Sequence, residues 1–308
     1  MSPAPDQSLR ACRLLLEQVG GATLPDDLLE PLRSLRTLAS SVGDLPELSR
    51  LTTFDSVLAT LREVLAHALS RNDIIRTSYI LAKLGSQIAS LPCTCRSSAI
   101  ARIRTAACAL APRHQVRVLA GLTAIIDSLT EDQRQVTFRD LLATASNLDP
   151  GVRHDVLVSL TKSIGQLAPA SRTEAFDRLY NALRGLEGWQ KAKILAALGT
   201  IVDCLPEPDQ LGRFKNLCTA AIFLGSSLQA EVLVGLASVI GNPPTLEALA
   251  TPSPSWLAER KMRFDILQAA ANRVDLRYRH GLLIKLAEAI GKLPQACRRP
   301  HSAHEPSQ

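Results

Sequence analysis

The chain has 308 residues and a formal net charge of +6, with 35 Lys and Arg against 29 Asp and Glu. Hydrophobic residues make up 46% of it but aromatic residues only 4%, which is unlike a large single core filled with Phe, Trp and Tyr. No apolar stretch of about 18 residues lacks a charge and no basic start precedes an apolar run, so neither a membrane span nor a secretory signal is expected.

The two ends are predicted to differ from the middle. Residues 1–8 are polar and contain Pro, and residues 298–308 offer nothing to bury, so we expect both ends to be disordered. Residues 9–46 hold apolar runs without a clean repeat, which is typical of degenerate capping helices at the end of a repeat array.

Residues 47–297 repeat themselves, and this repeat predicts the fold. A helical pattern L-x-x-L-x-x-x-I begins at Leu81, Leu119, Leu157, Leu195, Leu233 and Leu283. The period is about 38 residues except before Leu283, where it is longer. Apolar residues at offsets of 3 and 7 share one face of a helix, which we call the first helix of each repeat. Small residues recur where these helices should approach each other closely, at Gly85, Gly121, Gly199 and Gly235.

A break and a second helix follow each first helix. The break is Leu-Pro at 45–46, 91–92, 205–206 and 293–294, and Pro stops a helix at the residue before it. The second helix carries its own apolar stripe, in which Phe138, Phe176 and Phe214 are again one period apart. A lone hairpin cannot bury its apolar face, so the repeat predicts an all-α solenoid of stacked helical hairpins, like HEAT or armadillo repeats.

Cationic side chains recur at one position of the repeat. An Arg stands four residues after each break except at Gln210, forming what we call the Arg ladder: Arg50, Arg96, Arg134, Arg172, Arg260 and Arg298. One interpretation is a column of guanidinium groups that binds phosphates or acidic side chains of a partner. The other is that each Arg donates to the unpaired carbonyls that end the first helix.

A second candidate for partner binding is an insertion near 243–258, which is rich in Pro and ends near Trp256. It lengthens one connection by about 12 residues, and long connections in compact arrays are often functional. An aromatic side chain there can anchor a partner. The alternative is a surface loop whose Trp256 folds back on the helices.

Enzyme and metal motifs are missing from the sequence. There is no HExxH, GxSxG or P-loop pattern, and none of the seven Cys forms a CxxC pair or a zinc spacing with His. We therefore expect free thiols, no metal, no cofactor and no catalytic residues.

The combined spacing of Leu, Ile, Pro, Arg and Phe resembles the SKWP group of HEAT/armadillo-like type III secretion effectors from plant-pathogenic bacteria. The segments that carry the resemblance are LVSLTKSIGQLAPASRTEAFDRL (157–179) and LAALGTIVDCLPEPDQLGRFKNL (195–217). The resemblance implies a protein-interaction scaffold that leaves the bacterial cytoplasm by type III export and binds host plant proteins. The alternative is an RNA-binding helical-repeat protein that uses the Arg ladder, since the period also resembles that of RNA-binding arrays such as the octotricopeptide type.

Overall fold

The computed structural model describes residues 29–67, 71–240 and 254–292, and over these residues the only regular secondary structure is helical. The described residues divide into two compact units, one that ends at Leu167 and one that begins at Ala168. The predicted disordered ends, the first part of the predicted cap and most of the insertion lie outside the described residues, so these predictions stay predictions.

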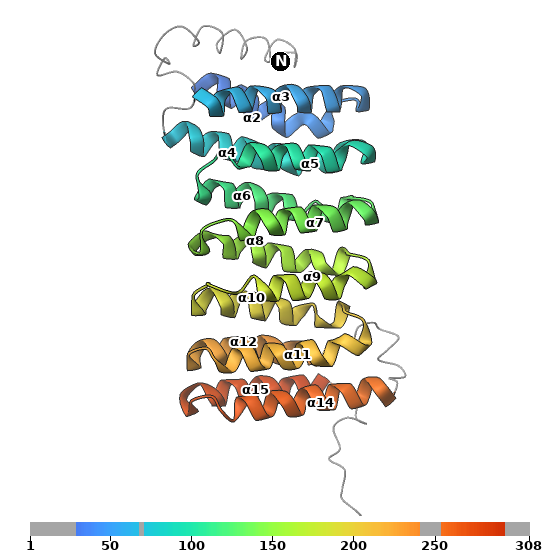
Figure 1. Cartoon of the computed structure of the whole chain (residues 1–308), viewed down its shortest axis with the longest axis vertical. Coiled ribbons are helices and arrows are strands. Elements are labelled where there is room, and N and C mark those ends of the chain that lie inside the picture. The colour runs from blue at the N-terminus through green and yellow to red at the C-terminus, as the bar shows by residue number, and fades with distance from the viewer. Residues whose placement is uncertain (1–28, 68–70, 241–253, 293–308) are drawn as a thin grey trace, which may run out of the picture. The chain divides into compact units, whose positions relative to one another are not determined.

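The first unit is a stack of helical hairpins (Figure 1). Its first helices are α2 (Leu29–Ser41), α4 (Arg71–Ser86), α6 (Pro112–Thr123) and α8 (Pro150–Ser163). Each of them runs into a short 3-10 turn, η1 (Val42–Asp44), η2 (Ile88–Ser90), η3 (Ile126–Ser128) and η4 (Ile164–Gln166). The second helices are α3 (Glu47–His67), α5 (Cys93–Ala107) and α7 (Glu131–Ser146). First helices pack on first helices and second helices on second helices, as the repeat predicts.

The second unit follows the same plan (Figure 1). It contains α9 (Pro169–Asn181), α10 (Gly188–Thr200) with its turn η5 (Val202–Cys204), α11 (Glu207–Ile222), α12 (Ser226–Ile240), α14 (Pro254–Ala271) and α15 (Leu276–Lys292). The first helices α10, α12 and α15 pack in that order, and the second helix α11 packs on α14. Both units therefore show the all-α hairpin repeat that the sequence predicts.

Local chemistry sets where each hairpin bends. At the breaks Leu45, Leu91 and Leu205 take extended backbone angles, with ψ between 156° and 159°. Pro follows each of them and disfavours the helical conformation in the residue before it. Helix starts are also fixed by side chains, for example by the capping box of Thr130 with Gln133.

The predicted stripes form the core. Leu119, Leu122 and Ile126 of one first helix are all 0% exposed, and Phe138, Phe176 and Phe214 of the second helices are at most 1% exposed. In α2 and its turn, Leu35, Leu38 and Val42 are buried at the same offsets of 3 and 7. The part of residues 9–46 that the structure describes thus follows the repeat pattern more closely than the sequence suggested.

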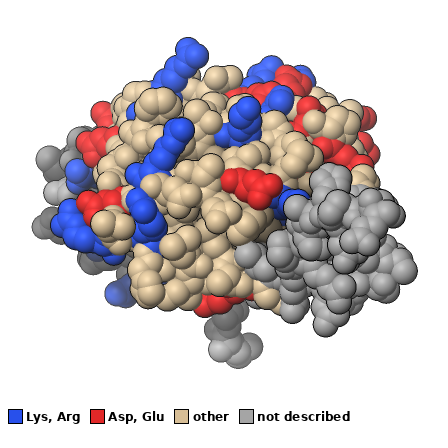
Figure 2. All heavy atoms as spheres, turned by 90° about the horizontal axis from the view of Figure 1, so that it is seen from below, with Lys and Arg blue, Asp and Glu red and all other residues tan. Residues whose placement is uncertain are grey.

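The last repeat differs from the prediction. Leu283, expected to be equivalent to Leu233, is 40% exposed, whereas Leu233 is 0% exposed. Leu286 of the same predicted stripe is buried, together with Leu282 and Ala289, because α15 packs on α12 and α14 and no helix that the structure describes covers its opposite side. Figure 2 looks onto this end of the second unit and shows wide uncharged surface between the basic and acidic side chains.

The small residues do not all mark close approaches. A Cβ added at Gly199 would lie 2.6 Å from Cδ2 of Leu236 in α12, so a larger residue there would force Leu236 to shift. A Cβ added at Gly121 would meet nothing within 4 Å. The prediction of close packing is therefore wrong for Gly121, which sits on the open face of α6.

Candidate functional site

The Arg ladder of the first unit bridges consecutive hairpin turns. The Nε of Arg50, Arg96 and Arg134 donates at 2.8 to 2.9 Å to the carbonyl of the Leu that precedes its own helix, at Leu45, Leu91 and Leu129. The Nη1 of the same side chains donates at 2.5 to 2.9 Å to the turn of the next hairpin, at Ser90, Ser128 and Gln166. One guanidinium therefore satisfies carbonyls of two repeats, in keeping with the second interpretation of the ladder.

In the second unit the ladder position keeps its contact with the next turn at Arg172 and has other partners at Arg260 and Gln210. Arg172 donates to the carbonyl of Cys204 at 2.8 Å, and Arg260 donates to that of Val239 at 3.0 Å. At the position where Arg is missing, Gln210 donates instead to the carbonyl of Leu205 at 2.7 Å. Of these donors Arg172 reaches the turn of the next hairpin, whereas Arg260 and Gln210 donate to carbonyls of their own hairpins. Arg298 lies outside the described residues.

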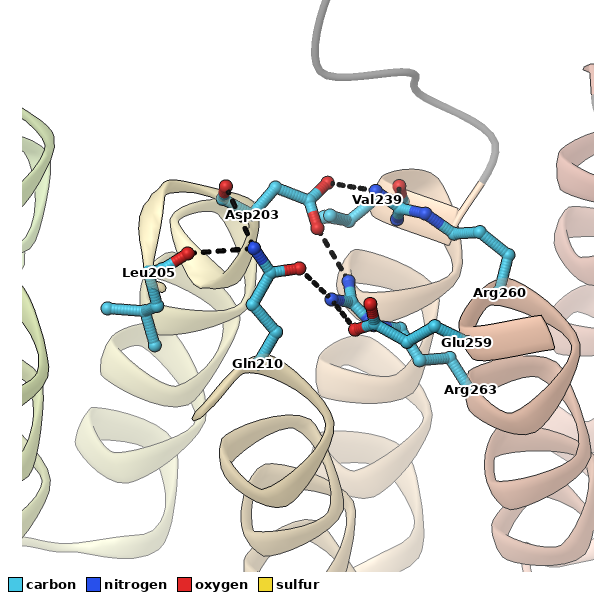
Figure 3. A network of polar contacts seen from close by, with 7 residues as sticks. All are labelled: Asp203, Leu205, Gln210, Val239, Glu259, Arg260 and Arg263. Atoms are coloured by element: carbon cyan, nitrogen blue, oxygen red, sulfur yellow. Dashed lines mark hydrogen bonds and ion pairs between the residues drawn. The ribbon is translucent and has the colours of Figure 1, made fainter. Parts of the chain in front are cut away.

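A buried ionic network joins α11 to α14 in the second unit (Figure 3). Asp203 contacts two arginines, with Oδ2 2.8 Å from Nη2 of Arg260 and Oδ1 2.6 Å from Nη1 of Arg263. Arg263 also donates to Gln210 at 2.7 Å and, through its Nε, to Glu259 at 3.0 Å. Two cations thus face two carboxylates, which is the condition under which buried charges are tolerated.

The network encloses one of the predicted binding residues. The side chain of Arg260 is 2% exposed, and that of Arg263 is 0% exposed. The guanidinium of Arg260 lies over the ring of Trp256 at 5.1 Å from its centroid, and Trp256 is half-buried. Residues 254–258, predicted as the end of the insertion, form the first turns of α14 instead, since Pro254 suits the first position of a helix.

A groove that sequence reasoning missed lies between α2 and α4 of the first unit. Its volume is about 920 Å³, and Arg33, Arg36, Ser40, Arg76, Tyr79, Lys83 and Ser86 line it over a floor of Leu32, Ile80 and Ala82. Tyr79 is 52% exposed, and Arg117 of α6 stacks its guanidinium 3.8 Å from the centre of this ring. Among the described residues, the lining has four cationic side chains and no acidic one.

The same face continues between α6 and α8 as a smaller groove of about 280 Å³. Its lining is mostly small and polar, namely Ala120, Thr123, Ala124, Ser159, Ser163 and Gln166, and its charges are balanced by Asp127 and Lys162. We call the exposed surface of α2, α4, α6 and α8 the first-helix face. One hollow of this face lies between α2 and α4 and the other between α6 and α8.

A metal-binding arrangement is not found in the part of the chain that the structure describes. It contains no group of three or more His, Cys, Asp or Glu side chains placed to hold a metal ion. The described cysteines are Cys93, Cys95, Cys108, Cys204 and Cys218, all of them free thiols, and burial raises the pKa of the Cys218 thiol to about 12. Among the described helices, none has the length and apolar character needed to cross a bilayer.

Comparisons with known proteins give no family. No family model and no curated protein matches the chain. Among solved structures, a designed armadillo repeat protein in complex with the peptide (KR)4 is 14% identical with a TM-score of 0.24, covering 95% of this chain and 92% of the other. A computationally designed self-assembling cyclic homo-oligomer is 10% identical with a TM-score of 0.25, over 94% and 91%. An engineered protein is 14% identical with a TM-score of 0.30, over 91% and 80%.

These TM-scores are too low to support an argument about function. The class of protein, an all-α helical-hairpin repeat, follows from the packing within each unit. Partner binding by Arg50, Arg96, Arg134, Arg172, Arg260 and Trp256 stays a prediction. The groove residues gave a weaker signal in the sequence, since Arg33 and Arg36, like Arg76, Tyr79 and Lys83, are spaced by three or four on one helix face but do not recur in later repeats.

Proposed function

We propose that this chain is a protein-interaction scaffold that binds a segment of another protein along its first-helix face. The observation that carries the proposal is the groove of about 920 Å³ between α2 and α4, which has charged walls and an apolar floor. A repeat array offers such a surface because each hairpin exposes the side of its helices that does not pack on neighbours.

The alternative of an RNA-binding array loses its main support. That alternative relied on a free column of guanidinium groups, but Arg50, Arg96 and Arg134 each donate to backbone carbonyls of two hairpins. A donor that is already bonded inside the protein gains little from a phosphate, because binding would exchange one hydrogen bond for another.

The test is a selection of displayed random peptides on the purified full chain. The proposal predicts enriched peptides that bind saturably and that lose affinity when the exposed Tyr79 of the first-helix face is changed to Asp. The matched variant Lys215→Asp lies on the exposed side of the second helix α11 and should leave binding unchanged. A selection without any saturable peptide would contradict the proposal.

The resemblance to SKWP-type effectors supports a more specific proposal. In it the chain leaves the bacterial cytoplasm by type III export and binds a host plant protein. A fusion of the full chain to a reporter that is active only inside host cells tests this. We expect a signal that disappears in a bacterial strain without the type III apparatus, and a signal that persists in that strain would refute the export route.

A further inference from the structure

The groove between α2 and α4 is distinguished by its charge. Arg33, Arg36, Arg76 and Lys83 line it, and the carboxylate of Asp73 lies 3.6 Å from Arg76. The neighbouring groove on the same face holds one cation and one carboxylate. Positive charge therefore gathers at one end of the first-helix face rather than along all of it.

The groove also has an apolar component. Leu32, Ile80 and Ala82 form its floor, and the ring of Tyr79 is held in the wall by the guanidinium of Arg117. Its volume of about 920 Å³ lies near the upper end of the range of about 300–1,000 Å³ that is typical of ligand sites. A site of this size and composition suits several side chains of mixed acidic and apolar character.

The position of nearby carboxylates favours a protein partner over a nucleic acid. Tyr79, Arg117 and Asp155 hold equivalent positions in α4, α6 and α8, so this position is acidic in α8. A phosphate backbone that continued along the face would meet the exposed Asp127 and Asp155, whose charge repels it. A short acidic segment can end before it reaches them.

We propose that this groove binds an acidic segment of a partner protein that also carries an apolar side chain. The carboxylates contact Arg33, Arg36, Arg76 and Lys83, and the apolar side chain packs on Tyr79 and Ala82. This inference rests on the proposed function and adds the chemistry of the partner. Arginine binds carboxylates through two parallel hydrogen bonds, so these side chains favour Asp and Glu by geometry as well as by charge.

The experiment measures the anisotropy of a short fluorescent peptide of Glu, Ser and Leu on the full chain. We expect saturable binding that weakens as salt rises, and at least about tenfold weaker binding for the double variant Arg36→Glu/Lys83→Glu. The control is Lys215→Glu/Lys261→Glu, which makes the same change in net charge at exposed positions of α11 and α14 and should bind as the unchanged protein does. Circular dichroism checks that each variant keeps its helices.

Several outcomes would overturn the inference. One is equal binding of the peptide in which Gln replaces Glu, and another is equal loss of affinity in the control variant. A third is that a single-stranded RNA oligonucleotide binds more tightly than the peptide and that the Arg36→Glu/Lys83→Glu variant abolishes this RNA binding. If the display selection yields first-helix-face peptides that are not acidic, the scaffold function stands and this inference falls.

Discussion

At the residue scale, the repeat depends on the geometry of one side chain. A guanidinium offers donors in a planar fork, so Arg96 can reach the carbonyls of Leu91 and Ser128 at once. These carbonyls belong to the turns of two successive hairpins, where helix ends leave carbonyls without partners. At Arg50, Arg96, Arg134 and Arg172 the ladder therefore links a hairpin to the turn of the next one through backbone carbonyls.

Replacing Arg96 by Ala should lower the free energy of unfolding by about 1–3 kcal/mol, since two half-buried carbonyls lose a charged donor. Arg96→Lys keeps the charge but has no fork, so its loss should be intermediate. Urea unfolding measures both, with Lys215→Ala on an exposed surface as a control expected to change stability by less than about 0.5 kcal/mol. An Arg96→Ala variant as stable as this control would contradict the bridging role.

Burial of Cys218 makes stability depend on alkaline pH. The pKa of this thiol is raised from 9.0 to about 12, so the folded state holds its proton over a range where the unfolded state loses it. The resulting stabilisation is complete below about pH 9 and is lost as pH rises through the folded pKa near 12. Unfolding free energies measured between these limits should fall more steeply for the native chain than for Cys218→Ala. Parallel slopes would show that the thiol is not protected.

The sequence predicted individual core residues better than polar contacts. Leu119 and Phe138 were assigned to buried stripes because spacing on a helix decides burial, and both are buried. The pairing of Asp203 with Arg263, which lie far apart in the sequence, leaves no such periodic signal. The groove residues Arg33 and Lys83 were missed for the same reason, because they belong to a single pair of helices rather than to the repeat.

At the scale of helices, packing between first helices sets which small residues are required. Gly199 of α10 faces the fully buried Leu236 of α12, whereas Gly121 of α6 faces open space. The sequence grouped them only as small residues of the first helices, although Gly199 lies four residues after Leu195 and Gly121 two residues after Leu119. Which neighbour a new Cβ would meet depends on the side chain opposite it in the next helix, since Gly235 has the same offset as Gly121 and yet would meet Ala196 at 3.4 Å.

The two glycines make a matched pair of substitutions. Gly121→Ala should stabilise the chain by about 0.5–1 kcal/mol, since alanine loses less backbone entropy in a helix and meets no neighbour. Gly199→Ala should destabilise it, because the new Cβ would lie 2.6 Å from Cδ2 of Leu236 and overpacking costs about 1–3 kcal/mol. Thermal unfolding compares them. Equal shifts in the midpoint would refute the packing difference between α10 and α12.

Removing a charge from the network between α11 and α14 should lower the free energy of unfolding far more than removing one from an exposed ion pair. Asp203→Asn removes the carboxylate charge shared by two buried arginines and should cost about 3 kcal/mol. The control is Asp177→Asn, which breaks the more exposed pair of Asp177 with Arg213 and should cost less than about 1 kcal/mol. Equal losses in denaturant titrations would mean that the network adds no stability of its own.

At the scale of the whole molecule, each unit has a structural and an exposed component. The structural component consists of the Arg ladder, the Leu and Phe stripes and the Asp203 network, which contact other helices and turns of the protein. In the first unit the exposed component is the first-helix face, with a basic groove at one end and small and polar side chains beyond it. The location of the cations therefore indicates more about the chemistry of a partner than the modest net charge of +6 does.

The fold was predictable at this scale because the same spacing of apolar residues occurs in several successive repeats. The proposed binding surface was not, since its residues differ between repeats. Leu283 shows where the repeat spacing fails to predict burial. It keeps the spacing but is exposed, because no described helix covers it.

The most direct test of the central claim is site-specific photo-crosslinking with a peptide from the display selection. A photoreactive amino acid replaces Tyr79 on the first-helix face or Lys215 on the second helix α11, both of them exposed positions. Crosslinking at position 79 and not at 215 is the predicted result. A peptide that binds saturably but crosslinks only at position 215 would contradict the assignment of the first-helix face as the binding surface.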